Sequence, residues 1–413
     1  MHTLGCKLNQ AETELLASQF AKAGFQVTNN NNADVCILNT CTVTHIADRK
    51  SRHLLRLLRK RNPQALIVAT GCYAERAPQD LNNIGVDLVI DNEQKMNILN
   101  LVKSELSLKE TRSTGDTEID NHFRVRSFVK IQDGCDDFCT YCIVPLVRGH
   151  ESCLPAEEII NTIKARVHAG YKEVILTGTK IGTYNHNGIN LKKLVDHILK
   201  ETTIPRLHLS SLQPQEISKD FLKLWQDSRL CRHFHIALQS GSNSVLKRMG
   251  RHYSTEEYKM AVEIIRELVP DVAITTDIMA GFPGESVAEF EESYNFCRDT
   301  GFADIHVFSY SARPGTAAAK MSGQVNEKLK KERSLRMLAL AKESAQNFQK
   351  KFLGQVMAVL WETETSQNTD IYSGLSNNYI RVFSRSPENL TNTISSVRLT
   401  RLYRDGLWGE LIL

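Results

Sequence analysis

The chain of 413 residues has no apolar run near the ~18 residues that a membrane-spanning helix requires. Its first residues, 1–6, have none of the character of a secretory signal peptide. We therefore expect a cytoplasmic protein without a membrane partner. Charge of one predominant sign is also lacking, because the formal net charge is only +4. The bulk charge thus does not by itself indicate a nucleic-acid partner, and the distribution of charge matters more.

Two nucleotide-binding fingerprints are missing as well, since the chain contains no Gly-x-Gly-x-x-Gly run and no P-loop. Their absence removes the usual sequence signals of dinucleotide-dependent and nucleoside-triphosphate-dependent enzymes. The share of hydrophobic residues, 41%, and of charged residues, 24%, is that of an ordinary globular protein with a sizeable core. The length favours about two to three domains.

Cysteine, by contrast, is plentiful, with ten residues in a chain that carries no secretion signal. In that setting cysteines indicate metal or redox ligands rather than disulfides. Cys135, Cys139 and Cys142 follow the spacing C-x3-C-x2-C, with no fourth cysteine at matching spacing. A zinc site normally takes four protein ligands, whereas three thiolates suit a cubane iron–sulfur cluster that leaves one iron open. A partial zinc site and three ordinary buried cysteines remain the alternatives.

A second set of three cysteines is spread over the first part of the chain. Cys6, Cys41 and Cys72 each come just after a predicted strand, the second and third of which cover residues 34–39 and 65–70. Predicted helices separate these strands, so we expect an open parallel α/β domain. Ligands bind at the carboxyl edge of such a sheet, and the three thiols are therefore expected to converge on a second iron–sulfur site. The alternative is a coincidence of cysteines at strand ends.

The other cysteines and two histidines carry weaker signals. Cys36, Cys231 and Cys297 lie in apolar or helical patterns and are expected to be small core residues. His235 and His306 alternate with apolar residues, so we expect them to line the core or a pocket rather than to bind a metal.

A helix is predicted over residues 46–60, with one apolar face and one strongly basic face. Arg49, Lys50 and Arg52 belong to the basic face. Such a run is usually a solvated helix face, but it also suits contact with the phosphates of a nucleic acid. The helix alone does not decide between these interpretations.

The central part of the chain repeats a strand–helix unit. Strand-like runs recur at residues 126–131, 173–177, 206–210, 233–238, 273–279 and 306–310, with helical stretches between them. Alternation of this kind predicts parallel βα units, and six of them indicate a partial or complete (β/α) barrel. Such barrels build their active sites after the strands. There we find the pocket candidates Thr177, Gly178, Ser211 and Gln239.

The last sixty residues predict several short strands, with a hairpin signal at Asp405-Gly406. We expect a small β-barrel. Arg381 and Arg398 are among the arginines that alternate there with aromatic residues, a pattern that suits RNA binding by stacking and phosphate contact. The alternative is an ordinary structural β domain. The predicted domains cover residues 1–108, 121–350 and 353–413, and a polar linker lies near residues 104–123.

At Cys135, Cys139 and Cys142 the sequence resembles the radical S-adenosylmethionine superfamily, and the whole chain resembles its methylthiotransferases. The matching stretches are Gly5 to Gln10, Asn39 to Thr44, Thr70 to Cys72, Cys142 to Pro145, Arg148-Gly149, Leu238 to Ser242, Thr276 to Ile278 and Gly281 to Glu285. The last sixty residues resemble a TRAM domain, which is an RNA-binding barrel. Cys153 departs from the pattern, because relatives tend to carry a basic residue there.

The run from Gly5 to Glu14 is most similar to the branch that modifies threonylcarbamoyladenosine in tRNA. The resemblance implies insertion of a methylthio group at C2 of that base, at position 37, with two S-adenosylmethionine molecules. It implies two [4Fe–4S] clusters, one on each cysteine trio, and a flavodoxin- or ferredoxin-like electron donor. Tyr141 is a candidate to cover the adenine of the cofactor, and we expect a monomer. The alternatives are the isopentenyladenosine branch and a non-enzymatic iron–sulfur protein that binds RNA or carries electrons.

Overall fold

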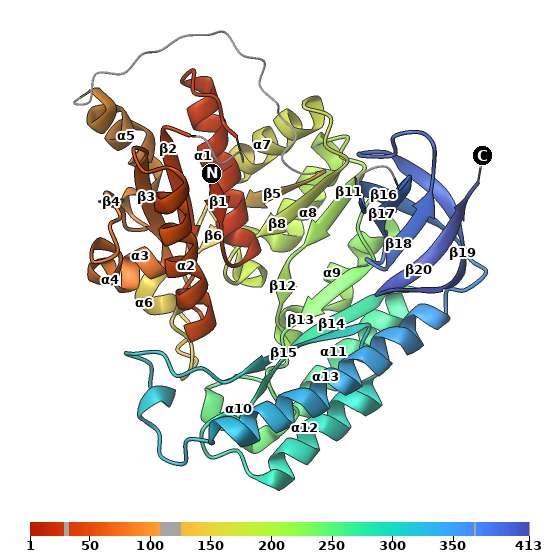
Figure 1. Cartoon of the computed structure of the whole chain (residues 1–413). Coiled ribbons are helices and arrows are strands. Elements are labelled where there is room, and N and C mark those ends of the chain that lie inside the picture. The colour runs from red at the N-terminus through yellow and green to blue at the C-terminus, as the bar shows by residue number, and fades with distance from the viewer. Residues whose placement is uncertain (29–32, 108–124, 367–368, 413) are drawn as a thin grey trace. The chain divides into compact units, whose positions relative to one another are not determined.

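The computed structural model describes residues 1–28, 33–107, 125–366 and 369–412 (Figure 1). The chain divides into two compact units, each assembled from separate stretches. Unit 1 comprises Met1–Phe123, Gln132–Ser152 and Ser311–Ala319, and unit 2 comprises Arg124–Ile131, Cys153–Tyr310 and Lys320–Leu413. The predicted linker lies mostly outside the described residues, so it and the three domain boundaries stay predictions. Among the described residues, no helix combines the length and apolar character needed to cross a membrane.

Unit 1 contains an open sheet of four parallel strands in sequence order. The strands are β1 (His2–Thr3), β2 (Val35–Thr40), β3 (Leu66–Gly71) and β4 (Leu88–Val89). The helices are α1 (Lys7–Lys22), α2 (His45–Arg61), α3 (Cys72–Arg76), α4 (Pro78–Asn82), α5 (Ile98–Ser107) and, from the second stretch, α6 (Val144–Arg148). Helix α2 begins where the Thr44 side chain accepts a hydrogen bond from the backbone of Ala47. It buries Leu55 and Leu58 on the sheet side, as its apolar face predicts.

Unit 2 contains two neighbouring parallel sheets that together form the predicted partial (β/α) barrel. Their orders are β11-β8-β5 and β12-β13-β14-β15. The strands are β5 (Arg126–Lys130), β8 (Glu173–Thr177), β11 (Arg206–Leu209), β12 (Ser211–Leu212), β13 (His233–Ile236), β14 (Ala273–Ala280) and β15 (Asp304–Ser309). The helices are α7 (Ala156–His168), α8 (Leu191–Glu201), α9 (Lys219–Leu222), α10 (Asn243–Met249), α11 (Thr255–Leu268), α12 (Val287–Thr300) and α13 (Glu327–Lys350), visible beside the strands in Figure 1.

The strands β13, β14 and β15 have two unlike faces, because successive side chains of a strand point to opposite sides. One face carries Phe234, Ile274 and Ile305, all of which are buried in the main hydrophobic core. The other face carries polar side chains, among them His235 of β13 and Asp277 of β14. The pairing of Asp277 with His306 across β14 and β15 places this histidine on the polar side as well. The apolar face packs the fold, which leaves the polar face for chemistry.

The C-terminal strands form a closed five-stranded barrel in the order β16-β17-β18-β20-β19, as the sequence predicts. They are β16 (Val356–Glu364), β17 (Ile371–Ser376), β18 (Arg381–Arg385), β19 (Ile394–Tyr403) and β20 (Gly406–Leu411). Trp361 fills the barrel core and is fully buried. Tyr403 pairs with Gly406, so the hairpin turn consists of Arg404 and Asp405, one residue earlier than the Asp-Gly signal suggests.

A buried polar group joins this small barrel to the strands of the larger one within unit 2. The fully buried carboxylate of Glu173 forms an ion pair with Arg206 at 2.8 Å and accepts a hydrogen bond from the Tyr379 hydroxyl. Arg206 also donates to the backbone carbonyls of Leu375 and Ser376 at 2.8 and 2.9 Å. Since a buried charge is costly unless it is paired, these contacts fix the two barrels to each other. As predicted, Cys36, Cys231 and Cys297 are small buried core residues.

Candidate metal centre

The loop with Cys135, Cys139 and Cys142 lies in unit 1, between the short strand β6 (Gln132–Asp133) and helix α6. The loop begins at Gly134, whose φ of +67° is a conformation that favours glycine. Any other residue would also place a Cβ atom in collision with the His150 carbonyl. All three cysteines are half-buried. The backbone N–H of Cys142 donates to the Cys139 carbonyl at 3.0 Å, which closes a tight turn between the last two thiols.

The second trio lies at one edge of the unit 1 sheet. Cys6 is the N-cap residue of α1, just beyond β1, while Cys41 follows β2 directly. Cys72 is the first residue of α3 and follows β3 directly. Since these are neighbouring parallel strands, all three cysteines lie at the carboxyl edge of the sheet. This is the edge that the sequence predicts for them.

The three thiols are close enough to influence one another electrostatically. Burial raises the pKa of Cys41 to about 12, and the neighbouring thiolates of Cys72 and Cys6 contribute to that rise. A Cβ atom on Gly5 would lie 3.1 Å from the Sγ of Cys41, so the backbone beside Cys6 is already in contact with that sulfur. Asn9 holds the two strand ends together by donating to the carbonyls of Leu4 and Thr40 at 2.8 and 2.9 Å.

The donor set suits an iron–sulfur cluster in both places. All ten cysteines are free thiols, and each trio offers three sulfur donors on short connections after strands. Thiolate is the form that ligates metal, so cluster binding removes the proton that burial retains on a free thiol. Three thiolates are one fewer than a closed four-cysteine site and leave one iron of a [4Fe–4S] cluster for another ligand.

Arg148 connects the two trios, because it follows the first loop and is bound to the helix that begins at Cys6. Its guanidinium contacts both carboxylate oxygens of Glu12, at 2.8 and 3.2 Å, and the Asn9 side chain at 2.6 Å. A further contact of 2.8 Å joins it to Asp133. Arg148 and Glu12 are almost completely buried, so this ion pair fixes the end of the cysteine loop to α1.

Lys95 completes the group by donating to Glu12 at 2.6 Å from an equally buried position. Burial raises the pKa of Cys72, and the nearby positive charge of Arg148 opposes that rise. Cys72 also packs in one buried cluster with Ile143 and Val147, which follow Cys142 in the chain. The second trio is therefore in direct contact with the segment that carries the first.

A third stretch of unit 1 also contacts both cysteine segments. Arg313, which is 1% exposed, forms an ion pair with Asp48 at 2.6 Å, just beyond the loop that holds Cys41. Farther along this stretch, the backbone N–H of Ala318 donates to the Thr140 carbonyl inside the first loop, at 2.7 Å. Arg313 and Lys95 could not be identified from the sequence, because nothing local distinguishes them from solvated basic residues.

The predicted pocket residues fall at strand ends. Thr177 is the last residue of β8 and Gly178 follows it, Ser211 begins β12, and Gln239 comes after β13. Gln239 adopts φ of +68° and exchanges backbone hydrogen bonds with β14, at 2.8 and 2.9 Å. These four share the carboxyl edge of the unit 2 strands, whereas Tyr141 belongs to unit 1. Their role in binding a cofactor stays a prediction.

The predicted RNA-binding residues have different surroundings. Arg49 and Lys50 are exposed on α2. Arg52 donates to the Tyr73 hydroxyl at 2.5 Å, and this hydrogen bond raises its pKa. Arg381 has Asp405 at 3.3 Å and Glu362 at 3.8 Å, and the exposed Arg398 donates to a backbone carbonyl at 3.2 Å. Arg49 and Lys50 thus offer the most available charge of the five.

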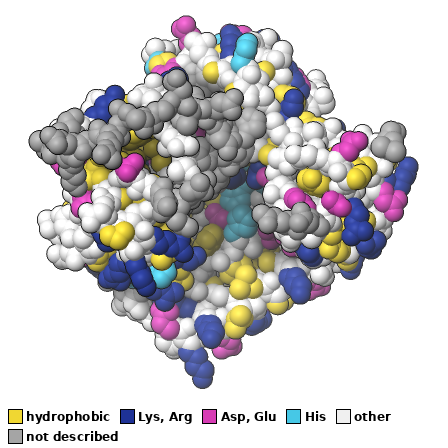
Figure 2. All heavy atoms as spheres, turned by 45° about the horizontal axis from the view of Figure 1, so that its top comes forward, with side chains coloured by type: hydrophobic (Ala, Val, Ile, Leu, Met, Phe, Trp, Pro, Cys, Tyr) yellow, Lys and Arg dark blue, Asp and Glu magenta, His cyan; other side chains and the backbone are white. Residues whose placement is uncertain are grey.

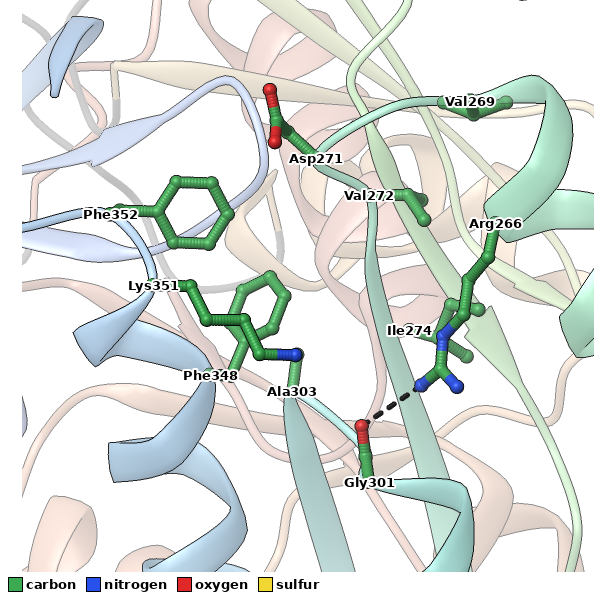
Figure 3. A pocket seen from close by; sticks show the side chains of 10 residues that line it. All are labelled: Arg266, Val269, Asp271, Val272, Ile274, Gly301, Ala303, Phe348, Lys351 and Phe352. Carbon is green, nitrogen blue, oxygen red and sulfur yellow. Dashed lines mark hydrogen bonds between the residues drawn. The ribbon is translucent and has the colours of Figure 1, made fainter.

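A cavity of about 220 Å³ lies at the opposite end of the unit 2 strands, near the start of β14 (Figure 3). Its lining includes Val272 and Ile274 of that strand region and Phe348 and Phe352 from the end of α13. Arg266 points into it and donates to the Gly301 carbonyl at 2.9 Å. This end of a parallel α/β barrel serves stability rather than chemistry, so we assign the cavity no role in the site.

Two family models match the chain. Residues 129–297 match the radical SAM superfamily, and residues 1–91 match a family described as uncharacterized protein family UPF0004. Among solved structures, the chain is similar to the radical S-adenosylmethionine methyltransferase TsrM from Kitasatospora setae, with a TM-score of 0.54 and 13% identity. That alignment covers 75% of this chain and 69% of the other. The likeness concerns the fold.

Curated relatives cover nearly the whole chain. A threonylcarbamoyladenosine tRNA methylthiotransferase from Aquifex aeolicus is 38% identical, over 90% of this chain and 94% of its own length. A protein of the same name from Bacillus subtilis is 34% identical, over 100% and 96%. A tRNA-2-methylthio-N(6)-dimethylallyladenosine synthase from Thermodesulfovibrio yellowstonii is 31% identical, over 99% and 97%.

Proposed function

Because this chain belongs to the radical S-adenosylmethionine methylthiotransferase family, we propose that it inserts a methylthio group at C2 of N6-threonylcarbamoyladenosine at position 37 of tRNA. The observation that carries this proposal is the pair of relatives with that named substrate, at 34–38% identity over nearly the full chain. Relatives named for dimethylallyladenosine are 31–34% identical over 99–100% of this chain, which overlaps the lower end of that range. The same chemistry on that base is therefore the second candidate.

The family implies S-adenosylmethionine and a [4Fe–4S] cluster, and we propose that Cys135, Cys139 and Cys142 hold this cluster. We place a second cluster on Cys6, Cys41 and Cys72. The contact of Cys72 with the segment after Cys142 supports this assignment, because transfer between two sites requires that they stay close. The C2–H bond of a purine is not acidic enough for base catalysis, and a bound cluster with S-adenosylmethionine supplies a 5′-deoxyadenosyl radical instead.

The protein's own part is to position these groups. Arg148, Glu12 and Lys95 form a buried ionic network between the two cysteine segments, and Asp133 supplies the second negative charge. Arg148 also favours the thiolate form of Cys72, the form that ligates iron. We further propose that Arg49 and Lys50 on α2 contact tRNA phosphates. A flavodoxin- or ferredoxin-like reductant completes the proposed cytoplasmic reaction, with the enzyme as a monomer.

Mass spectrometry of tRNA nucleosides from a deletion strain tests the substrate. The proposal predicts that threonylcarbamoyladenosine loses its methylthio group while the methylthio form of isopentenyladenosine persists. The opposite pattern would establish the second candidate. An unchanged nucleoside profile, together with reduced cluster spectra that S-adenosylmethionine does not alter, would indicate a non-enzymatic iron–sulfur protein.

The cluster assignment has its own test. Cys139→Ala should retain about half of the iron, because it removes one ligand from one of two three-thiolate sites. It should also produce no 5′-deoxyadenosine from S-adenosylmethionine. Cys153→Ala is the matched control, since this half-buried cysteine belongs to neither trio, and it should keep all iron. Normal production of 5′-deoxyadenosine by Cys139→Ala would refute the assignment.

A further inference from the structure

Three side chains on the polar face of the unit 2 barrel strands converge outside both cysteine trios. They are His235 of β13, Asp277 of β14 and His306 of β15, and one ligand atom from each lies within 4.8 Å of the others. The Nε2 atom of His235 is 3.2 Å from one carboxylate oxygen of Asp277, and the Nδ1 atom of His306 is 3.3 Å from the other. Two imidazoles and a carboxylate therefore point to one place.

These distances match the separation of ligands around a small metal ion. Two atoms that each lie about 2.1 Å from a tetrahedral metal are about 3.4 Å apart. The two imidazole rings are stacked at an interplanar angle of 22° and a centroid distance of 5.3 Å, so both nitrogens approach the carboxylate from the same side of the sheet. The sheet itself fixes this arrangement, because Asp277 and His306 are paired residues of adjacent strands.

The outer contacts of His235 are those of a metal-ligating histidine. Its second nitrogen, Nδ1, is 3.0 Å from the hydroxyl of Thr275, which fixes the ring and leaves Nε2 directed at Asp277. Thr275 in turn contacts His233 at 3.2 Å. A ligating histidine commonly uses its other nitrogen in this way.

We propose that His235, Asp277 and His306 form a binding site for a divalent transition metal of the Zn²⁺ or Fe²⁺ class, separate from the iron–sulfur ligands. Two imidazoles and one carboxylate are the donor set of many such sites. Three protein ligands leave at least one coordination position for water or for an oxygen of a bound substrate. Asp277 is 24% exposed and His306 is 50% exposed at the side chain, so an ion can enter. In Figure 2, histidine side chains gather beside acidic ones on the visible face.

This inference departs from the expectation for the isolated sequence, in which His235 and His306 were pocket-lining residues without a metal. The alternation of polar and apolar residues along each strand is the same in both interpretations. The two interpretations are distinguished by the register between the strands, which pairs Asp277 with His306 while the other carboxylate oxygen of Asp277 lies near His235.

The test uses the full-length holoenzyme, with its iron–sulfur clusters assembled anaerobically, and Zn²⁺ as the probe. After incubation and desalting, elemental analysis should find about one zinc ion per chain with an unchanged iron content. X-ray absorption at the zinc edge should show only nitrogen and oxygen ligands near 2.0–2.1 Å, whereas binding to cysteine would give sulfur near 2.3 Å.

Two variants at the site, one variant beside it and one control complete the design. His306→Gln and Asp277→Asn should each lose the zinc, and Thr275→Val should weaken binding about 10- to 100-fold, as expected for a residue that orients a ligand. The exposed His252 lies outside the cluster, so His252→Gln should bind zinc normally. Iron content and tryptophan fluorescence report whether each variant is folded.

Three results would overturn the proposal, and each points to a plain hydrogen-bonded His–Asp–His group instead. The first is a wild-type holoenzyme that retains no zinc. The second is zinc with sulfur ligands. The third is zinc retained by both site variants while they are folded.

Discussion

Replacement of Arg148 by methionine is expected to loosen the part of unit 1 that joins the two cysteine trios. The substitution keeps an unbranched side chain of similar length and removes the charge that Glu12, Asn9 and Asp133 bind. Glu12 would keep its buried ion pair with Lys95.

Removal of one member of a buried ion pair costs about 3–5 kcal/mol, because the other charge stays desolvated and unpaired. Lys95 reduces this cost for Glu12, and Asp133 regains water because its side chain is 19% exposed. We therefore expect the loss of stability to lie at the lower end of this range, about 3 kcal/mol. Each 1.4 kcal/mol corresponds to a tenfold change in an equilibrium constant, so this part of unit 1 should open locally about 100-fold more often.

Hydrogen exchange measured by mass spectrometry resolves this effect by segment. Peptides from α1 and from Gln132–Ser152 should exchange about 100-fold faster in Arg148→Met. Peptides from unit 2 should not change, and neither should the fluorescence of Trp225, Trp361 and Trp408, because all three tryptophans belong to unit 2.

Arg56→Met is the matched control, since it removes the same charge from an exposed position on α2. Surface substitutions of this kind usually change stability by less than about 0.5 kcal/mol. Equal exchange in Arg148→Met and Arg56→Met would refute the view that the buried network holds the two cysteine segments together. Equal acceleration in unit 2 would show a general loss of stability instead.

Three further outcomes are expected. Tyr379→Phe leaves the buried Glu173 carboxylate short of one hydrogen bond and should lower the free energy of unfolding by about 1–3 kcal/mol, measured by denaturant titration of tryptophan fluorescence. Hydrogen bonding from Arg248 lowers the pKa of Glu289 to about 2, so its stabilisation is present above pH 4.5 and lost as the pH falls toward 2. Glu289→Gln should therefore flatten the acid dependence of the unfolding midpoint in that range. Arg49→Ala should weaken tRNA binding and reduce the slope of log K against log salt by about 0.9 if it contacts one phosphate.

The sequence was sufficient for the main strands and helices of each part and for the placement of Cys6, Cys41 and Cys72 after strands. Cys41 and Cys72 could be placed at one sheet edge because each follows a short apolar run, a signal that is local, and Cys6 because it follows a short predicted strand. The predicted open sheet, partial barrel and small β-barrel are all present. Helix α2 was predicted to within one residue at each end, since its apolar and basic faces are local features too.

The contacts around the cysteines could not be predicted in the same way. Arg148 binds Glu12, and Arg313 binds Asp48, across long stretches of chain whose approach depends on the whole fold. Glu12 belongs to the run that carries the resemblance to one family branch, yet nothing in that run reveals a buried ion pair. The group around Asp277 was missed for a related reason, because strand register is a property of pairs of strands.

Unit 1 is assembled from three stretches of the chain, and this has a consequence for biosynthesis. Its first stretch ends at Phe123, but Arg313 belongs to the last one, about 200 residues later. At about 5–20 residues per second, a ribosome needs roughly 10–40 seconds to make that interval. During this time Cys6, Cys41 and Cys72 have left the ribosome, while the arginine that pairs with Asp48 has not yet been made. The proposed second cluster on these thiols would therefore have this interval in which to assemble before the last stretch of unit 1 is made.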